Sequence, residues 1–384
     1  MEIFIGDCVR SVRGKARPDG GLAKQTPYGL VGALIDAVEQ RGSVERSDVD
    51  KLTLGCVGQT GAQGGHIALV TKIASGLPET GSAHTINNFC ASGLTAIGQA
   101  VSAVAAGHSR IALAGGVEML SHVPFMGDQA DYYTDMTFAP IDRYIPVVLA
   151  ADLLAGEMDV TREEMDDLSY LSQSRAGKAE TDSGLQASRI AIGGLDHDEA
   201  VRVTTREKLA AMPASFGELA KQYAHALTGE ASAPRMTVAN APPMTDGAGL
   251  AVVGGREAFE SPRARVVAFA DAGSNARQSL TAGFVAMDKV LEDAGLSLDQ
   301  MDRIEFMEAF AVPYALFRRN YQPDMDKVNV SGGHIAKGHP MGATGAILLS
   351  TLLDALDAAN GKYGLVVASG AQGVGVAMIV ERLS

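Results

Sequence analysis

The sequence predicts an α/β protein built from two similar halves, with an insertion in the first half. Short β-branched runs alternate with longer segments whose apolar residues recur at helical spacing, which is typical of helices packed on buried sheets. The same order of elements starts again at about residue 264. The segment of about residues 121–235 is more charged and more helical than the rest. We therefore expect an N-terminal half of residues 1–120 plus 236–258, an inserted loop domain of residues 121–235 and a C-terminal half of residues 259–384.

The first half contains a regular set of expected elements. The N-terminal residues 1–15 begin as a short alternating strand, and the other expected strands are residues 51–58, 110–120 and 249–255. The expected helices are residues 26–42 and 94–107, because their apolar residues recur at helical spacing.

The second half repeats this order, and the insertion has one clear helix. We expect a strand at residues 263–273, a helix at 280–295, a strand leading into a helix at 303–311, and a terminal hairpin at 361–383. In the insertion, the segment 160–179 predicts a helix. Thr161 suits its N-cap, and Glu164 three residues later completes a capping-box pattern.

Composition limits the classes of function. A content of 46% hydrophobic and 20% charged residues is typical of a folded, soluble protein. The formal net charge of -13 disfavours nucleic acid or an anionic membrane as the main partner, because both require a basic face. An anionic small ligand stays open, through a local basic patch.

The cysteines and the apolar segments point to the cytoplasm. Cys8, Cys56 and Cys90 lack metal-ligand spacing and are odd in number, so we expect neither a disulfide framework nor a metal site. The N-terminus lacks the long apolar run of a signal peptide. Glycines interrupt the longest uncharged stretch, residues 363–380, so we expect two buried strands around a turn and no membrane insertion.

Cys90 is the first candidate for chemistry, in NNFCASGLTAI at residues 87–97. It follows a strand-like segment and precedes a helix, whose positive N-terminal end would lower the pKa of the thiol. The alternative is a buried, inert cysteine. The small residues that follow Cys90 leave room for a ligand, which favours the chemical interpretation.

His339 is the second candidate, in NVSGGHIAKGHPMGATGA at residues 329–346. Glycines on both sides allow a sharp, fixed bend that could hold a base at hydrogen-bond distance, although a lone histidine is often structural. A phosphate-binding loop is a weaker interpretation, because GxxxxGK[ST] and GxGxxG are absent in the required context. If the fold brings Cys90 and His339 together, they form a thiol and base pair for acyl transfer from thioesters.

Together these motifs resemble the thiolase family over essentially the whole chain. An upstream CxSG, an EAFA segment and a GHPxGATG segment form a highly specific combination, and GGVEML at residues 115–120, TDGAG at 245–249 and GAQGVGVAMIVERL at 370–383 support it. The resemblance implies a five-layered αβαβα fold of two similar halves with an inserted loop domain. It also implies a homodimer or homotetramer.

The resemblance also implies a mechanism. Cys90 would take an acyl group from acyl-CoA, with His339 as its base, and a carbon–carbon bond would then be made or broken. The backbone N–H groups of Cys90 and Ala371 would form an oxyanion site. Coenzyme A thioester would be a substrate, with no permanently bound cofactor and no metal.

Some positions depart from the thiolase pattern. Ser369 stands where the family has a second catalytic cysteine, and a hydroxyl is a poor replacement for a thiol in reversible proton transfer. Met307, directly before Glu308 near the site, replaces an Asn or His that helps to hold a water in an oxyanion site. These departures place the second half of the usual reaction in question.

Other unusual positions are close to the expected substrate. Contacts to CoA would be changed by Pro242, by Pro146 with Val147, and by Met212. His334 stands where a small residue is common, and it could cap a turn or replace the polarity lost at Met307. Lys337 could be solvated or contact an anionic substrate.

Three functions remain open at this point. The first is thiolase-type acyl transfer on acetyl-CoA or a 3-ketoacyl-CoA. The second keeps the acyl-enzyme on Cys90 but passes the acyl group to water or an amine, or uses it in a decarboxylative condensation. The third is a non-catalytic partner subunit of a larger acyl-CoA complex, against which the intact pair of Cys90 and His339 weighs. The partner would be acyl-CoA or another acyl thioester.

Overall fold

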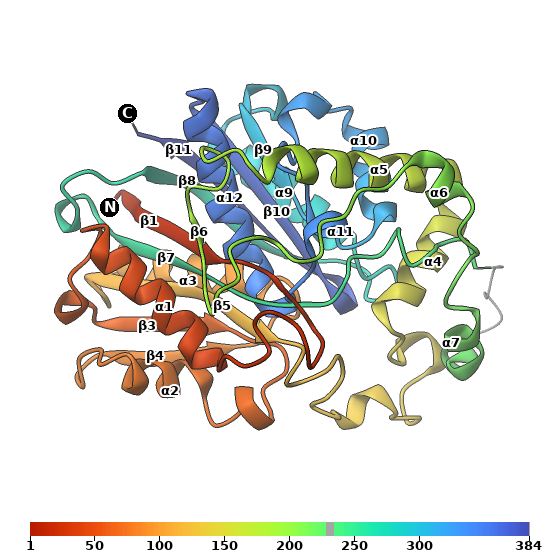
Figure 1. Cartoon of the computed structure of the whole chain (residues 1–384), viewed down its shortest axis with the longest axis horizontal. Coiled ribbons are helices and arrows are strands. Elements are labelled where there is room, and N and C mark those ends of the chain that lie inside the picture. The colour runs from red at the N-terminus through yellow and green to blue at the C-terminus, as the bar shows by residue number, and fades with distance from the viewer. Residues whose placement is uncertain (228–233, 384) are drawn as a thin grey trace.

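The computed structural model describes residues 1–227 and 234–383, and one mixed sheet runs through both halves (Figure 1). The strands follow the order β4-β3-β5-β7-β1-β8-β11-β10-β9, with β2 paired to β7 and β6 to β1. Their bounds are β1 Ile3–Ser11, β2 Gly14–Lys15, β3 Lys51–Gly55, β4 Ser82–Ile86, β5 Ile111–Met119, β6 Arg189–Ile190, β7 Thr245–Gly255, β8 Ala264–Gly273, β9 Arg303–Phe306, β10 Tyr363–Gly370 and β11 Val374–Arg382.

The helices cover the sheet and build the insertion. Their bounds are α1 Pro27–Gln40, α2 Ile67–Ala74, α3 Ser92–Ala105, α4 Val147–Glu157, α5 Arg162–Ala179, α6 Arg206–Ala210, α7 Gly217–Gln222, α8 Ala224–Leu227, α9 Ala282–Ala294, α10 Ala311–Tyr321, α11 His334–Lys337 and α12 Thr344–Ala359. The expected strands and helices of both halves are all present.

The helices lie in three layers with sheet between them. Helices α1 and α2 cover the outer face of the first half, α3 and α12 pack against each other in the centre, and α9 covers the outer face of the second half. Strand β10 shows the two faces: Gly364 packs against Leu356 of α12, whereas Ser369 packs against Gly283 of α9. This is the predicted αβαβα order.

Strand β1 differs from the expected alternating pattern. All nine of its residues are buried, because α1 packs on one face of the strand and α12 on the other. Strand β1 also joins the two halves, since Phe4 and Ile5 pair with Arg265 and Ala264 of β8. A strand buried on both faces carries no alternation in exposure.

Two apolar segments near the C-terminus are buried in the core. The expected hairpin forms from β10 and β11, which pair antiparallel from Tyr363–Glu381 to Gly370–Val374. The segment Met341–Ala359 is long and apolar enough to cross a membrane, but 89% of its most apolar stretch is buried inside the protein. It lies in the centre of the protein, where α12 packs against α3.

The expected insertion contains helices α4 to α8. Helix α5 has the predicted capping box: the N–H of Thr161 donates to Glu164 Oε2 at 2.9 Å, and the N–H of Glu164 donates to Thr161 Oγ1 at 3.2 Å. The exact boundaries of the insertion stay a prediction, and residues 228–233 lie outside the described chain.

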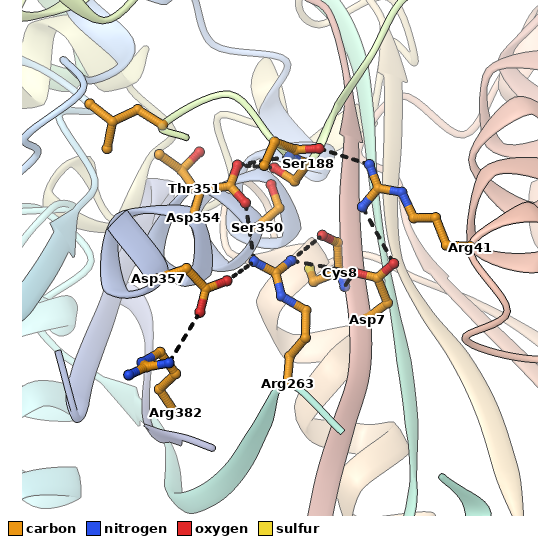
Figure 2. Close-up of polar contacts among 12 residues, drawn as sticks. Asp7, Cys8, Arg41, Ser188, Arg263, Ser350, Thr351, Asp354, Asp357 and Arg382 are labelled. Atoms are coloured by element: carbon orange, nitrogen blue, oxygen red, sulfur yellow. Dashed lines mark hydrogen bonds and ion pairs between the residues drawn. The ribbon is translucent and has the colours of Figure 1, made fainter. Parts of the chain in front are cut away.

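A polar network at the junction of the halves holds β1, β8 and α12 together (Figure 2). Arg263, just before β8, pairs with Asp7 of β1 at 3.3 Å and with Asp354 and Asp357 of α12 at 3.2 and 2.7 Å. Ser188, from the insertion, donates its hydroxyl to Asp354 Oδ2 at 2.6 Å. All three parts of the chain therefore meet at one set of charges, in which Asp7 and Asp354 are buried.

Candidate active site

Two central helices bring the two sequence motifs together. Helix α3 begins just after Cys90, and α12 begins five residues after His339. The helices cross at backbone contact, since a Cβ on Gly345 would lie 2.5 Å from the backbone nitrogen of Leu94. Only glycine permits this approach. As a result, Cys90 and His339 line the same cavity.

Cys90 follows a strained turn between β4 and α3. Phe89 has a φ of 47°, in the left-handed region that a bulky residue rarely adopts. Side chains hold this turn: Asn87 Oδ1 accepts from the N–H of Phe89 at 2.9 Å, and Ser92 donates to the Phe89 carbonyl at 2.5 Å. Strain of this kind is typical of functional sites, and here it presents the thiol to the cavity.

The pKa of the Cys90 thiol is raised, not lowered as expected from its place before a helix. Burial is the main cause and the charge of Glu118 the second, and together they raise the pKa of Cys90 to about 12. The backbone N–H groups of Ala371 and of Cys90 itself bond to the sulfur and act in the opposite direction. The two predicted oxyanion donors therefore both point at the Cys90 sulfur.

His339 is fixed by its backbone and by one ring nitrogen. Its N–H donates to the Pro243 carbonyl at 2.9 Å, and its Nδ1 lies 2.8 Å from Thr344 Oγ1 at the start of α12. Burial, and then the positive charge of Arg13, lower the pKa of His339 to about 3. Arg13 also donates to the Gly338 carbonyl at 3.2 Å, so it touches the backbone of the bend.

These shifts define the resting state of the pair. A thiol with a raised pKa and an imidazole with a lowered pKa are both neutral at pH 7. A preformed thiolate–imidazolium pair is therefore disfavoured. The proton can move to His339 as the sulfur attacks a carbonyl and charge passes to the oxyanion donors.

Glu118 is absent from the residues predicted above, and it connects the loops around the pair. Its fully buried carboxylate accepts from the N–H groups of Val57, Gly58 and Gly342 at 2.9, 3.0 and 3.0 Å, and from the Gln63 amide at 2.7 Å. Burial raises the pKa of Glu118, although these hydrogen bonds act to lower it. Glu118 is part of the motif GGVEML. A charged residue within a predicted buried strand was the sequence signal that could have identified it as a site residue.

The cavity at Cys90 and His339 has a volume of about 590 Å³ and is mostly apolar. Pro242, Pro146 and Val147 line it, at positions where the resemblance places contacts to CoA. Met212 does not line it, and its carbonyl accepts from Arg162. The other apolar lining residues include Phe125, Val148, Phe216, Leu219, Ala241 and Phe310.

Ser369 is turned toward helix α9. Its Oγ accepts from the N–H of Gly283 at 3.1 Å, in the first turn of α9, and Ser369 is absent from the residues that line the cavity. The first N–H groups of a helix need such acceptors. In this structure the hydroxyl therefore satisfies a helix terminus, and its role in proton transfer stays a prediction.

Met307 and Glu308 lie in the core beside the cavity. Met307 is 2% exposed, within the hydrophobic core. Glu308 is fully buried and accepts from Ser172 Oγ at 2.6 Å, from Asn329 Nδ2 at 2.9 Å and from the Ile335 N–H at 3.3 Å. The carboxylate of Glu308 thus holds the segment before His339 in place.

The expectations for His334 and Lys337 need correction. Neither ring nitrogen of His334 makes a hydrogen bond to the described residues, so its side chain does not cap a turn. Lys337 is fully buried, not solvated, because α11 lies inside the protein, and its Nζ donates to Ser331 Oγ at 2.9 Å. Lys337 is also absent from the cavity lining, so it does not contact a ligand there.

A metal site is not visible in the part of the chain that the structure describes. No group of three or more His, Cys, Asp or Glu side chains lies there in an arrangement that could hold a metal ion. The chemical groups at the cavity are a thiol, an imidazole and two backbone N–H donors. This set suits acyl transfer from a thioester.

Comparison with known proteins agrees with this chemistry. Residues 4–257 match the thiolase N-terminal domain, and residues 260–382 match the thiolase C-terminal domain. The chain is 34% identical to a β-ketoadipyl-CoA thiolase of Pseudomonas aeruginosa, covering 100% of this chain and 99% of that protein. It is 30% identical to a 3-ketoacyl-CoA thiolase of Psychrobacter cryohalolentis, and the match covers 100% of this chain and 98% of that protein. A crystal structure of acetyl-CoA acetyltransferase from Bacillus anthracis superposes with a TM-score of 0.85 at 27% identity, covering 100% and 99%.

Proposed function

Because the chain belongs to the thiolase family of acyl-CoA acyltransferases, we propose that it forms an acyl-enzyme on Cys90 from acetyl-CoA or a 3-ketoacyl-CoA. The observation that carries this proposal is the shared cavity, which Cys90 and His339 both line. The N–H groups of Cys90 and Ala371 act on the Cys90 sulfur, which supports their proposed role as oxyanion donors.

With acetyl-CoA as the substrate, the first half-reaction follows from these groups. Cys90 Sγ attacks the thioester carbonyl while His339 takes the thiol proton. The carbonyl oxygen becomes negatively charged, and the backbone N–H donors stabilise it. The bond from carbon to the CoA sulfur then breaks, and His339 returns the proton to that sulfur. A free CoA thiol and an acylated Cys90 result.

The relatives and the cavity support a 3-ketoacyl or acetyl substrate. The names of the relatives are β-ketoadipyl-CoA thiolase and 3-ketoacyl-CoA thiolase, and that of the structural neighbour is acetyl-CoA acetyltransferase. A mostly apolar cavity of about 590 Å³ is large enough for an acyl chain and part of its carrier. We propose coenzyme A as that carrier.

Ser369 favours a second candidate function. In this candidate Cys90 is acylated as above, but the acyl group passes to water or an amine, or is used in a decarboxylative condensation. The Ser369 hydroxyl accepts from the Gly283 N–H, so it is oriented as a helix cap and not toward the cavity. Such reactions do not require a second acid–base group at an unactivated α-carbon.

Acylation can be tested by intact mass spectrometry. The protein is incubated with acetyl-CoA or acetoacetyl-CoA, and we expect an acyl adduct that is absent in Cys90→Ala. The matched control is Cys8→Ala, because Cys8 is fully buried and absent from the cavity lining. Lack of an adduct on the native protein would exclude both candidate functions.

A second experiment separates the two candidates. If the side chain at position 369 limits thiolysis, Ser369→Cys raises the rate of acetoacetyl-CoA cleavage by CoA. An unchanged rate points instead to Met307 or to the altered CoA contacts. Ser369→Ala is the control, because it removes the hydroxyl without supplying a thiol.

We also propose that the protein is a homodimer or homotetramer in the cytoplasm. Among the described residues, strand β4 pairs with β3 alone at one end of the sheet order, and exposed edge strands can pair with another chain. Met136, Phe138 and Ile141 expose 51, 43 and 49% of their surface on one loop. Light scattering coupled to gel filtration tests the oligomer, and a monomeric mass would contradict it.

A further inference from the structure

A second, small cavity lies beside Cys90. Its volume is about 20 Å³, which gives room for about one water molecule. Cys90, Phe125 and Val147 line both this small cavity and the large cavity of about 590 Å³ that His339 lines. The nucleophile is therefore shared by the two cavities.

The two cavities differ in their exposure. The lining of the large cavity includes Val238 and Met244, which expose 60 and 50% of their surface, so this cavity is open toward solvent. The lining of the small cavity includes the buried residues Glu118 and Tyr144. The long carrier of a thioester therefore fits the large cavity, and the end of a short acyl group on Cys90 fits the small one.

The small cavity carries negative charge. Its charged lining residues are Glu118 and Asp128, and no Lys, Arg or His side chain of the described residues lines it. The Glu118 carboxylate already accepts from four N–H donors. Asp128 accepts one hydrogen bond from the described residues, which the Tyr133 hydroxyl donates at 3.1 Å. Because a carboxylate has about four acceptor sites, Asp128 can accept more.

Tyr144 adds a hydroxyl without a partner in the described part of the chain. The residue is 3% exposed and lines the small cavity, and its hydroxyl makes no hydrogen bond to the described residues. Burial is the main cause that raises the pKa of Tyr144, and the charges of Cys90 and Asp128 contribute to the same shift. Buried polar groups are nearly always paired. The small cavity thus suits a group that can bond to Tyr144 and Asp128.

We propose that the small cavity selects a short acyl group that ends in an ammonium. The inference rests on the proposed acyl-enzyme chemistry. An ammonium has the size of a water molecule, can donate to Asp128 and to Tyr144, and is attracted by aromatic rings. A carboxylate is larger and would be repelled by Asp128. The acylation step is unchanged: Cys90 Sγ bonds to the carbonyl carbon, and CoA leaves with the thiol proton.

Three CoA thioesters of similar length test this selectivity. After two methylene groups, β-alanyl-CoA ends in an ammonium, butyryl-CoA in a methyl group and succinyl-CoA in a carboxylate. We expect single-turnover acylation of Cys90 at subsaturating thioester to be about 10- to 100-fold faster with β-alanyl-CoA than with butyryl-CoA. Succinyl-CoA should be at least about tenfold slower than butyryl-CoA. Equal rates with β-alanyl-CoA and butyryl-CoA would overturn the proposal.

Asp128→Asn separates the role of the cavity from the intrinsic reactivity of the thioesters. The amide keeps the size of the carboxylate but removes its charge, so the ratio of the β-alanyl to the butyryl rate should fall by about tenfold. The matched control is Asp131→Asn, at an exposed position of the same loop outside both cavities, which should keep the native ratio. An unchanged ratio in Asp128→Asn would overturn the proposal.

Binding to Cys90→Ala distinguishes this proposal from the proposed function. Without the thiol the thioesters stay intact, and calorimetry measures their dissociation constants. We expect β-alanyl-CoA to bind about tenfold more tightly than butyryl-CoA. If no CoA thioester acylates the native protein, the proposed function fails, and this comparison decides the selectivity alone. Equal dissociation constants would then overturn it.

Discussion

The two sides of the cavity region use their polar groups differently. On the side of Cys90 and His339, backbone donors point at the sulfur and Thr344 holds the imidazole. On the side of Ser369 and Met307, the hydroxyl caps helix α9 and the thioether lies in the core. Under the proposed mechanism, the groups that receive an acyl group are separate from those that pass it on. This chain has the proposed groups for the first task, whereas Ser369 and Met307 depart from the thiolase pattern for the second.

The largest effect should follow from removing the base on the first side. His339→Gln keeps a polar side chain but loses the imidazole that takes the Cys90 proton. We expect single-turnover acylation of Cys90 to fall by about 10²- to 10⁴-fold. Quenched-flow intact mass spectrometry measures this rate. A loss smaller than about tenfold would remove His339 from the first half-reaction.

Glu118→Gln should weaken the same side through its loops. The amide keeps the shape of the carboxylate but presents N–H groups to N–H donors, among them those of Val57, Gly58 and Gly342. An unpaired buried donor is costly, so we expect the free energy of unfolding to fall by about 2 kcal/mol. Acylation should slow as well, because Gly342 lies in the His339 loop. Urea unfolding measures the stability, and Glu260→Gln at an exposed position is the matched control.

Ser369→Ala probes the second side. Removing the hydroxyl leaves the Gly283 N–H without its acceptor, so we expect a loss of about 1 kcal/mol in the free energy of unfolding. Acylation of Cys90 should change by less than about threefold, because this side does not receive the acyl group. Thermal unfolding and single-turnover acylation provide the two readouts. A large fall in acylation would place Ser369 in the first half-reaction and end the distinction between the sides.

The smallest effect is expected from pH. The pKa of His339 is lowered to about 3, so the imidazole stays neutral, and able to accept a proton, well below its ordinary value of 6.5. The acylation rate should therefore stay nearly constant between about pH 5 and pH 8. Stability, unlike the acylation rate, should depend on pH. As pH falls from 6.5 toward 3, the unfolded chain gains a proton that folded His339 does not, which favours unfolding. An inflection of acylation near pH 6.5 would show that His339 has an ordinary pKa.

The sequence was sufficient to predict the helices and strands and to identify Cys90 and His339 as candidates. Periodicity located helices such as α5, because side chains on a half-buried helix follow a fixed spacing, and short apolar runs located buried strands such as β5. Glycines around His339 predicted a sharp bend, and Gly345 in that segment meets the backbone of Leu94 in α3.

Other properties depend on surroundings that no local pattern reports. The raised pKa of Cys90 arises from burial by residues distant in sequence, and this outweighs the effect of the helix terminus. The direction of Ser369 depends on Gly283, 86 residues away. The burial of Lys337 requires the packing of α11, which sequence spacing alone does not describe. Tertiary contacts therefore decide the chemistry of residues whose identity is plain from the sequence.

The contact between α3 and α12 has a consequence for how this catalyst can diversify. The nucleophile and the base are held together by main-chain atoms at Gly345 and Leu94, not by the side chains that meet the acceptor. A lineage with this framework can exchange those side chains step by step and explore new acceptors without losing its ability to load an acyl group. The same contact tolerates no added bulk, because a Cβ at Gly345 would lie 2.5 Å from the backbone nitrogen of Leu94 and would force α3 or α12 to shift.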